Sequence, residues 1–267
     1  MSSYTSRKPR TKACRQSRFS FMAHVPDVII LSGGFGLRLR GIIGEATPKP
    51  MAPIAGRPFM ELLLKQLKRH GFRRVILSVG YKHEVIRNYF GENACGMELV
   101  YAVESSPLGT GGALREAARH LKTETALAMN GDSYTDADLS RLVQGRADAD
   151  VTVVVIPETR SDAGSVVLGA DGRVKTFAEK RVVPESRYLS TGIYLLNKTL
   201  IGTVPDGEKV SLEEQILPKW LAEGKRVDAF IFNGACIDIG TPERYEKAQH
   251  ILEKVESETV LESEGRS

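Results

Sequence analysis

The segment from Leu31 to Met51, LSGGFGLRLRGIIGEATPKPM, constrains this chain more than any other part of its sequence. It follows an apolar run at residues 28–31 that is typical of a buried parallel strand. Three glycines and Arg38 lie within six residues, and Lys49 follows between two prolines. A glycine-rich turn after a strand can arrange backbone N–H groups around an anion, while Arg38 and Lys49 supply cations for phosphate oxygens. The segment therefore predicts an α/β sheet with a polyphosphate site at the end of its first strand.

Two other glycine-rich phosphate loops do not fit this segment. Gly34 and Gly36 begin the dinucleotide-binding pattern G-x-G-x-x-G, but Leu39 stands where the third glycine belongs. Gly41 is followed by Ile42, whereas the Walker pattern requires lysine and then serine or threonine. The pattern that remains is G-G-x-G-x-R-L followed by P-K-P. A plain tight turn with solvated basic residues is the alternative, and the P-K-P segment argues against it.

The rest of the chain alternates between strand-like and helix-like segments. In the first half, strands are predicted at 28–31, 75–79, 99–103 and 126–129, and helices after Pro58, at 83–90 and at 113–121. In the second half, strands are predicted at 151–156, 165–168, 174–177 and 188–196, and helices at 212–221 and at 242–255 behind the N-cap Thr241. This order predicts the α/β class, with a Rossmann-like mixed, mostly parallel sheet and helices on both faces. Ligands of such sheets bind at the carboxyl ends of the strands.

Charge and composition divide the chain into a body and two ends. Residues 1–24 carry six basic residues and no acidic one, so subtracting six from the net charge of +4 leaves −2 for the rest. The basic charge belongs to an N-terminal extension, residues 1–26, whose polar composition predicts disorder, and it argues against a nucleic-acid-binding body. An organelle transit peptide and an extension without function are the two interpretations of this segment. We expect one domain at 27–255 and a loose acidic tail at 256–267.

The three cysteines, Cys14, Cys95 and Cys236, form no C-x-x-C pattern and favour neither a disulfide framework nor a zinc site. No apolar run approaches the roughly 20 residues of a membrane-spanning helix. We therefore expect a cytoplasmic protein without a membrane partner. The sequence leaves the oligomeric state open, with a homo-oligomer as one option.

Two aspartates are candidates for a metal site. Asp132 directly follows the predicted strand at 126–129, and Asp238 lies between apolar neighbours and Gly240-Thr241-Pro242. A carboxylate at the carboxyl end of a strand is well placed for Mg²⁺ on phosphate oxygens, and an isolated buried acid needs a partner such as a metal. A turn-stabilising role is the alternative for Asp132. The five histidines show no metal-ligand spacing.

Three further segments contain polar residues near strand ends. Glu104 precedes a loop at 105–112, whose glycines would let backbone groups approach the edge of a nucleobase. Glu179 and Lys180 follow the predicted strand at 174–177, and Ser190-Thr191-Gly192 lies within the one at 188–196. Taken alone, the first segment fits a flexible loop with a helix cap, and the second fits a surface ion pair.

Together these motifs resemble the signature of sugar-1-phosphate nucleotidyltransferases, which make NDP-sugars from an NTP and a sugar phosphate. The resemblance extends over residues 27–250. It implies that Asp132 and Asp238 hold a catalytic Mg²⁺, that Arg38 binds the triphosphate, and that Lys49 stabilises charge on the α-phosphoryl group. It implies nucleotide contacts at Leu31, Ser32, Gly33, Gly34, Gly36, Glu104, Gly109, Thr110, Gly111 and Gly131. It implies sugar-phosphate contacts at Glu179, Lys180, Thr191 and Gly192.

Within the family, the segments T-P-K-P-M-A-P-I-A-G-R-P-F, P-L-G-T-G-G-A and N-G-D-S most resemble those of D-glycero-D-manno-heptose 1-phosphate guanylyltransferases. The resemblance implies transfer of GMP from GTP to that sugar phosphate, by an in-line displacement of pyrophosphate that needs no general base. Mannose-1-phosphate guanylyltransferases and N-acetylmuramate-1-phosphate uridylyltransferases share much of the scaffold and are alternatives. A non-catalytic NDP-sugar-binding regulatory protein is another, although the metal aspartates and the P-K-P lysine are present.

Overall fold

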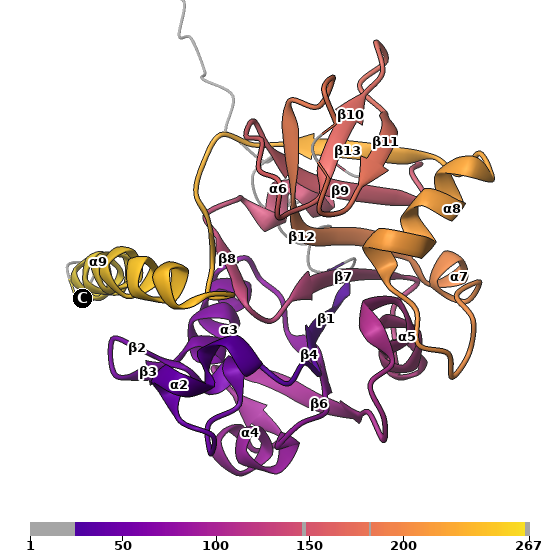
Figure 1. Ribbon diagram of the computed structural model, residues 1–267. Coiled ribbons are helices and arrows are strands. Elements are labelled where there is room, and N and C mark those ends of the chain that lie inside the picture. Colours follow the sequence, from indigo (N-terminus) through magenta and orange to yellow (C-terminus); the bar gives the residue numbers. More distant parts are fainter. Residues whose placement is uncertain (1–24, 146–147, 182, 265–267) are drawn as a thin grey trace, which may run out of the picture.

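A mixed ten-stranded sheet forms the centre of the molecule (Figure 1). The computed structural model describes residues 25–145, 148–181 and 183–264, so residues 1–24 of the predicted extension lie outside it. The middle of the sheet consists of β1 (Asp27–Ser32), β4 (Arg74–Val79), β6 (Met97–Val103) and β7 (Thr125–Asn130). These strands pair in parallel in the order β7-β1-β4-β6. They are the four strands predicted for the first half of the chain, so the predicted fold class is confirmed.

The second half of the chain extends the sheet with mainly antiparallel strands. β12 (Tyr188–Asn197) pairs with β7, and β10 (Ser165–Leu168) and β11 (Val174–Ala178) continue beyond it. β9 (Val151–Ile156) also pairs with β12, and β13 (Val227–Ile231) lies parallel to β9. The register between β9 and β12 shifts between Ser190 and Tyr194, an irregularity of the kind often found beside functional sites. The sequence did not predict β13, whose segment mixes apolar and charged residues.

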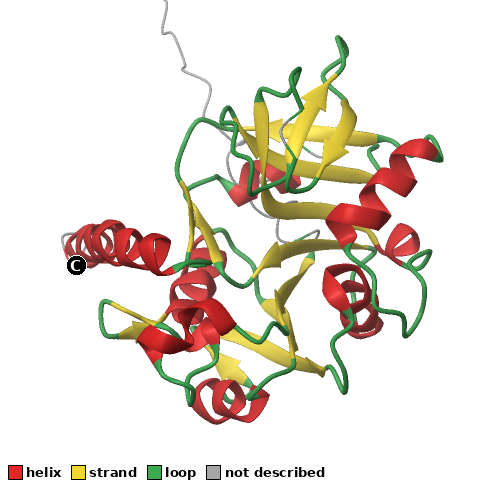
Figure 2. Ribbon diagram, in the orientation of Figure 1, coloured by secondary structure: helices red, strands yellow, loops and turns green. Residues whose placement is uncertain are grey.

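Helices cover both faces of the sheet, as predicted (Figure 2). Side chains alternate across a strand, so Val28 and Ile30 of β1 pack on one face while Ile29 packs on the other. The first face is covered by α3 (Phe59–Arg69), α4 (His83–Phe90), α6 (Leu139–Gln144) and α9 (Pro242–Glu264). The second face is covered by α5 (Gly109–Ala117), α7 (Lys198–Ile201) and α8 (Leu217–Ala222). Two apolar layers therefore hold the parallel strands in place.

α3 shows how local sequence and packing agree. The helix follows Pro58, and its residues Phe59, Leu63 and Leu67 are fully buried against the sheet. Gly71, with a φ of 89°, lies just past its end, as expected for a glycine that closes a helix. Burial of such side chains contributes roughly 1.5–3 kcal/mol each, which is enough to fix the helix on the sheet.

Several small elements lie at the edge of the sheet where the parallel strands have their carboxyl ends. The glycine-rich segment forms a 3-10 turn at Leu37–Leu39 and the short α2 (Arg40–Ile43), and the P-K-P segment forms a second turn at Lys49–Met51. Short strands pair as a hairpin of β2 (Pro53–Ile54) with β3 (Arg57–Pro58), and β5 (Asn93–Ala94) borders β6. A separate ladder joins β8 (Ser133–Thr135) to β14 (Cys236–Asp238). None of these strands is predictable from a hydrophobic period because each is at most three residues long.

Three predicted helices differ from those observed. The helix predicted at 113–121 begins at Gly109, and the one predicted at 212–221 begins with a π-turn at Leu212–Ile216. α9 begins behind Thr241, whose Oγ1 accepts from the Arg244 N–H at 3.4 Å, as the predicted N-cap would. It runs to Glu264, where a loose tail was predicted, because Glu and Leu favour helices and neither Gly nor Pro interrupts the segment.

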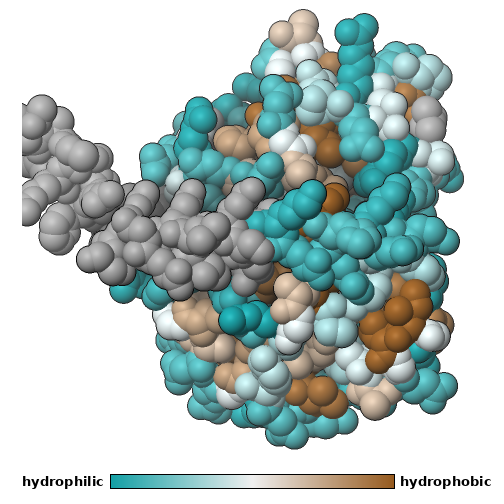
Figure 3. Space-filling view, turned by 90° about the vertical axis from the view of Figure 1, so that its left-hand side faces the viewer, coloured by the Kyte–Doolittle hydropathy of each residue, from teal (hydrophilic) through white to brown (hydrophobic). Residues whose placement is uncertain are grey.

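The face of the molecule that Figure 3 draws is mainly polar where it is coloured. On the face shown in Figure 3, hydrophilic residues predominate and hydrophobic residues form small separate patches. Across the described residues, no helix is both long enough and apolar enough to cross a membrane.

Candidate active site

Two clefts adjoin at the edge of the sheet where the parallel strands end. The first has a volume of about 620 Å³ and the second about 570 Å³. Both sizes lie in the range of small-molecule sites. The clefts share a boundary lined by Arg38, Thr110, Asn130, Asp132 and Gly240. Ligands in the two clefts would therefore meet at this boundary.

The predicted site residues separate between the two clefts. The first cleft is lined by every predicted nucleotide contact except one, namely Leu31, Ser32, Gly33, Gly34, Gly36, Glu104, Gly109, Thr110 and Gly131. The second cleft is lined by the predicted sugar-phosphate contacts Glu179, Lys180, Thr191 and Gly192. Lys49 lines the first cleft, Asp238 the second, and Arg38 and Asp132 line both. Motifs far apart in the sequence thus converge, as the sequence predicted.

Gly111 packs within the protein and lines neither cleft, so its nucleotide contact stays a prediction. It lies in the first turn of α5, where its N–H donates to the carbonyl oxygen of Val210 at 2.9 Å. A Cβ at this position would lie 3.1 Å from that same oxygen. The residue is therefore glycine because α5 packs closely on the Val210 segment. Thr191 also differs in part, since its hydroxyl donates to the Val154 carbonyl at 3.0 Å, leaving the backbone to face the cleft.

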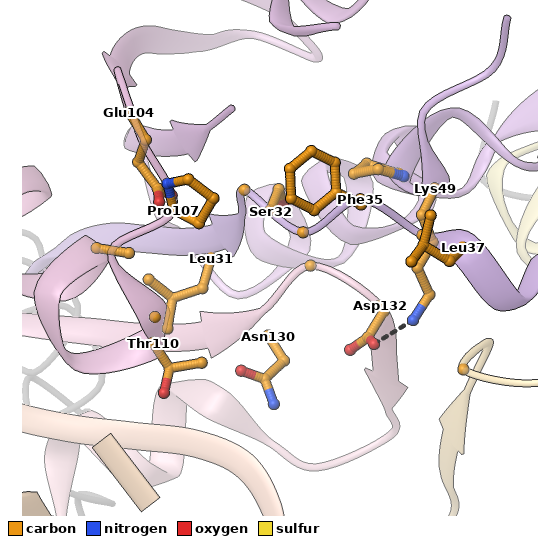
Figure 4. Close-up of a pocket in the computed structure, with 18 of the residues that line it drawn as sticks. Leu31, Ser32, Phe35, Leu37, Lys49, Glu104, Pro107, Thr110, Asn130 and Asp132 are labelled. Carbon is orange, nitrogen blue, oxygen red and sulfur yellow. Dashed lines mark hydrogen bonds and ion pairs between the residues drawn. The ribbon is translucent and has the colours of Figure 1, made fainter. Parts of the chain in front are cut away.

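The glycine-rich loop and the P-K-P turn bring two cations, Arg38 and Lys49, to the first cleft. Gly36 has a φ of 62°, and a Cβ there would lie 2.9 Å from the Cβ of Lys49, so glycine lets the two turns touch. Lys49 extends to Asp132, with 2.5 Å between Nζ and Oδ2 (Figure 4). Arg38 is exposed, and no carboxylate among the described residues pairs with it. Its guanidinium is therefore available to an anionic ligand.

Asp132 is held ionised by its surroundings. Burial acts to raise its pKa, but the Lys49 ammonium and the hydrogen bonds from Lys49 and Ser133 outweigh burial and lower the pKa. An ionised carboxylate is the form that accepts from Lys49 or binds a cation. At neutral pH Asp132 is thus a negative charge at the point where the clefts meet.

Asp238 is brought next to Asp132 by the β8–β14 ladder. Asp238 is opposite Ser133 in this ladder, and the Ile239 N–H donates to the Asp132 carbonyl oxygen at 2.9 Å. The Asp238 carboxylate accepts from the Gly240 N–H at 2.9 Å and from Arg244 Nη1 at 3.2 Å. Magnesium is usually held by one or two carboxylates and completes its shell with water and phosphate oxygens. Two aspartates on adjacent strands fit that requirement, and the described residues contain no group of three or more acidic, histidine or cysteine ligands.

Glu104 lies at the other end of the first cleft from Lys49 (Figure 4). Its Oε2 accepts from the Leu108 N–H at 3.0 Å, and its Oε1 accepts from the Ser78 hydroxyl at 3.2 Å. Burial raises the pKa of Glu104, while these two hydrogen bonds oppose the rise. The carboxylate is thereby fixed beside Pro107 and Leu31, whose side chains form an apolar wall.

The second cleft is lined by two neighbouring carboxylates, Glu179 and Glu213, of which the sequence predicted only Glu179. Glu213 is buried, and its Oε2 accepts from the Thr110 hydroxyl at 2.5 Å, while its Oε1 accepts from the Tyr194 hydroxyl at 3.4 Å. Burial and then the nearby charge of Glu213 raise the pKa of Glu179 to about 7. Burial and the same carboxylate raise the pKa of Tyr194 well above its ordinary value. The carboxylates of Glu179 and Glu213 offer hydrogen-bond acceptors suited to sugar hydroxyls.

The raised pKa of Glu179 predicts a pH-dependent effect on stability. The unfolded chain loses this proton near 4.5 and the folded chain near 7, so ionised Glu179 destabilises the fold as pH rises through this window. We expect Glu179→Gln to raise Tm by roughly 2–4 °C at pH 8, a value discounted for partial solvent exposure, and by less at pH 5. Thermal unfolding of both proteins from pH 5 to 8 checks this. An equal Tm difference at every pH would contradict it.

Several lining residues were not identified from the sequence. They are Asn130, which lines both clefts, Lys209 in the first cleft, and Arg160, Tyr194, Glu213 and Arg244 in the second. Asn130 could have been found, because it lies two residues before Asp132 at the end of the same strand. The others reach the clefts through contacts between distant segments and carry no local signal.

Comparison with known proteins agrees with this geometry. A family model described as nucleotidyl transferase matches residues 27–255. The chain belongs to the nucleotidyl transferase family. Relatives in the family include D-glycero-alpha-D-manno-heptose 1-phosphate guanylyltransferase of Aneurinibacillus thermoaerophilus, with 38% identity over 85% of this chain and 98% of the relative. The enzyme of the same name from Campylobacter jejuni is 39% identical over 82% of this chain and 96% of its own length.

Other members of the family are also similar. Mannose-1-phosphate guanylyltransferase of Mycobacterium tuberculosis is 36% identical, and the chain spans 63% of its length. The crystal structure of HddC from Yersinia pseudotuberculosis is 31% identical, with a TM-score of 0.75 over 85% of this chain and all of that one. A second structure of HddC, complexed with GMP-PN, gives a TM-score of 0.74. The family resemblance and the fold predicted from the sequence are thus confirmed.

Proposed function

We propose that this protein transfers GMP from GTP to D-glycero-D-manno-heptose 1-phosphate, releasing pyrophosphate and giving GDP-heptose. The observation that carries the proposal is the pair of clefts, which meet at the ion pair of Lys49 and Asp132. One cleft suits a nucleoside triphosphate and the other a sugar phosphate. The heptose 1-phosphate guanylyltransferases similar to this chain over nearly their whole length support the choice of substrates.

Guanine is favoured by the position of Glu104. A carboxylate only accepts hydrogen bonds, and guanine presents two adjacent N–H donors on its Watson–Crick edge. Uracil and thymine present a single donor between two carbonyl oxygens, and these oxygens would be repelled by the carboxylate. With Glu104 at the end of the first cleft, the triphosphate would extend towards Arg38 and Lys49. The HddC complex with GMP-PN agrees with a guanine nucleotide in such a fold.

The proposed reaction is an in-line displacement at the α-phosphorus of GTP. An oxygen of the sugar phosphate forms the new bond to phosphorus, and the bond to the bridging oxygen of pyrophosphate breaks. The attacking oxygen is already anionic, so the protein needs to align the groups and stabilise charge. Arg38 would bind the departing pyrophosphate, and Lys49 would stabilise the charge that develops on the α-phosphoryl oxygens. Magnesium, held by Asp132 and Asp238, would supply positive charge that offsets repulsion between the two phosphates.

The sugar would lie in the second cleft, with its hydroxyls towards Glu179 and the backbone at Thr191 and Gly192. Glu179 ionises near pH 7, so in neutral solution it can accept from a hydroxyl or donate to one. We include a cytoplasmic location in the proposal. It is supported by the cysteine pattern, because three cysteines without a C-x-x-C pair do not suggest the disulfide framework of an oxidising compartment.

The test is a grid of pyrophosphate-release assays with magnesium. GTP, UTP, CTP, dTTP and ATP would each be combined with the 1-phosphates of heptose, mannose, glucose and N-acetylmuramate. We expect release with GTP and heptose 1-phosphate, at a kcat/KM well above every other pair. A preference for mannose 1-phosphate would agree with the proposed mechanism but would contradict heptose 1-phosphate as the acceptor. Absence of release from every pair, by protein that still binds GTP, would reject catalysis and favour a regulatory role.

A further inference from the structure

Two arginines from distant segments lie together in the second cleft. Arg160 belongs to the loop between β9 and β10, and Arg244 lies in the first turn of α9. Both face Asp238, with Arg244 Nη1 at 3.2 Å from its Oδ2 and Arg160 Nη2 at 3.9 Å from the same atom. Arg244 also donates to Asp162, which is a further neighbour of Arg160. The cluster therefore surrounds one of the two candidate metal ligands with guanidinium groups.

The guanidinium groups of this cluster still have N–H donors that make no hydrogen bond within the described part of the chain. Arg160 Nε is buried and makes no hydrogen bond among the described residues, although Glu158 Oε1 lies 3.5 Å from it. The Arg160 and Arg244 side chains are only 30% and 28% exposed, so both guanidinium groups are partly desolvated. Charge-assisted hydrogen bonds gain strength where water is excluded. The cluster can thus accept an anion with oxygen atoms like those of the Asp238 carboxylate.

Lys180, which the family resemblance assigns to the sugar phosphate, is less favourably placed. Its side chain is 65% exposed and pairs with Glu214 at 3.3 Å. A solvated ammonium gives a phosphate less binding energy than a pair of partly buried guanidinium groups. The carboxylates of Glu179 and Glu213, which line the same cleft, would in turn repel a phosphate placed close to them. Arg160 and Arg244 are therefore better placed than Lys180 to hold the phosphate of a sugar phosphate in this cleft.

We propose that Arg160 and Arg244 bind the phosphate group of the acceptor sugar, and that Lys180 has a lesser part. This inference rests on the proposed function, because it concerns the second substrate of that reaction. The binding would fix the attacking oxygen beside Asp238 and the boundary of the two clefts. It also gives a reason for the position of Arg160 and Arg244 next to Asp238, an aspartate that the reaction needs.

Steady-state kinetics of Arg160→Gln and Arg244→Gln test the proposal. We expect KM for heptose 1-phosphate to rise about tenfold in each variant, because a charge-assisted hydrogen bond is lost, while KM for GTP stays within about twofold. Arg→Lys at either position should recover part of the loss, since it keeps the charge without the bidentate fork. Lys180→Gln should change the same KM less than either arginine variant.

Arg226→Gln is the matched control. Arg226 pairs with Asp228 at 2.9 Å and is 35% exposed, yet it lines neither cleft. A KM for the sugar phosphate that stays at the control value in both arginine variants would overturn the proposal. So would a loss confined to kcat and Tm, which would mean that the arginines only hold Asp238 and the loop in place.

A calorimetric titration with inorganic phosphate separates this inference from the proposed function. If the wild-type protein turns over no tested sugar phosphate with GTP, the proposed function fails, whereas the phosphate titration still tests the arginines. Weaker phosphate binding in Arg160→Gln and Arg244→Gln than in Arg226→Gln would support the inference. Equal phosphate binding in the three variants would overturn it.

Discussion

Asp132→Asn is expected to lower kcat for pyrophosphate release about a thousandfold, because the site loses the negative charge on which both Lys49 and magnesium depend. The pKa of Asp132 is lowered by Lys49, so the wild-type residue is ionised throughout the neutral range. Asparagine has nearly the same shape and can still accept from Lys49 through its amide oxygen. The variant should therefore fold, and KM for GTP should change little, because Arg38 and Glu104 are untouched.

The measurement is kcat with saturating GTP and sugar phosphate, together with Tm and a calorimetric titration with GTP. Asp206→Asn is the matched control, since Asp206 pairs with Arg119 at 2.7 Å on the surface and lines neither cleft. The control should keep wild-type turnover. Turnover within about threefold of wild type in Asp132→Asn, from folded protein, would remove Asp132 from the catalytic groups, because lost electrostatic stabilisation lowers rates far more.

The parts of the fold that the sequence predicted are those with a strong local pattern. β1 and β4 each contain a run of at least three apolar residues, and α3 has a buried face with helical spacing. The glycine-rich loop was also predictable, because a close approach to Lys49 and to a ligand needs residues without a side chain. Nine of the ten nucleotide contacts that the family resemblance implies line the first cleft.

What could not be predicted depends on contacts between distant segments. The β8–β14 ladder has three residues in each strand, so no period reveals that Asp238 lies next to Ser133. Arg160 and Arg244 meet at Asp238 only after α9 has packed against β14. Gly111 lies outside the first cleft for a similar reason, because nothing local indicates that Val210 packs on it. Sequence motifs therefore identified the chemistry common to the family. The neighbours of each charged side chain could be identified only from the folded structure.

Base selectivity gives the second large expected effect. Glu104→Gln should lower kcat/KM for GTP about a hundredfold, because the amide keeps only one acceptor towards guanine and presents a donor to its second N–H. Activity with UTP should rise relative to GTP, since glutamine can pair with the donor and one acceptor of uracil. The loop should stay in place, because the amide oxygen can still accept from the Leu108 N–H.

The test compares kcat/KM for GTP, UTP, CTP and ATP in the variant, in the wild type and in Glu116→Gln. Glu116 pairs with Arg119 at 3.1 Å in α5 and lines neither cleft, so its variant controls for the loss of a nearby carboxylate. A fall that is equal for all four nucleotides would mean that Glu104 supports the loop through Leu108 and Ser78 without reading the base. Guanine recognition would then belong to the backbone at Gly109 and Thr110. A loss confined to GTP requires direct contact, because the two N–H donors of the Watson–Crick edge distinguish guanine from the other bases at this carboxylate.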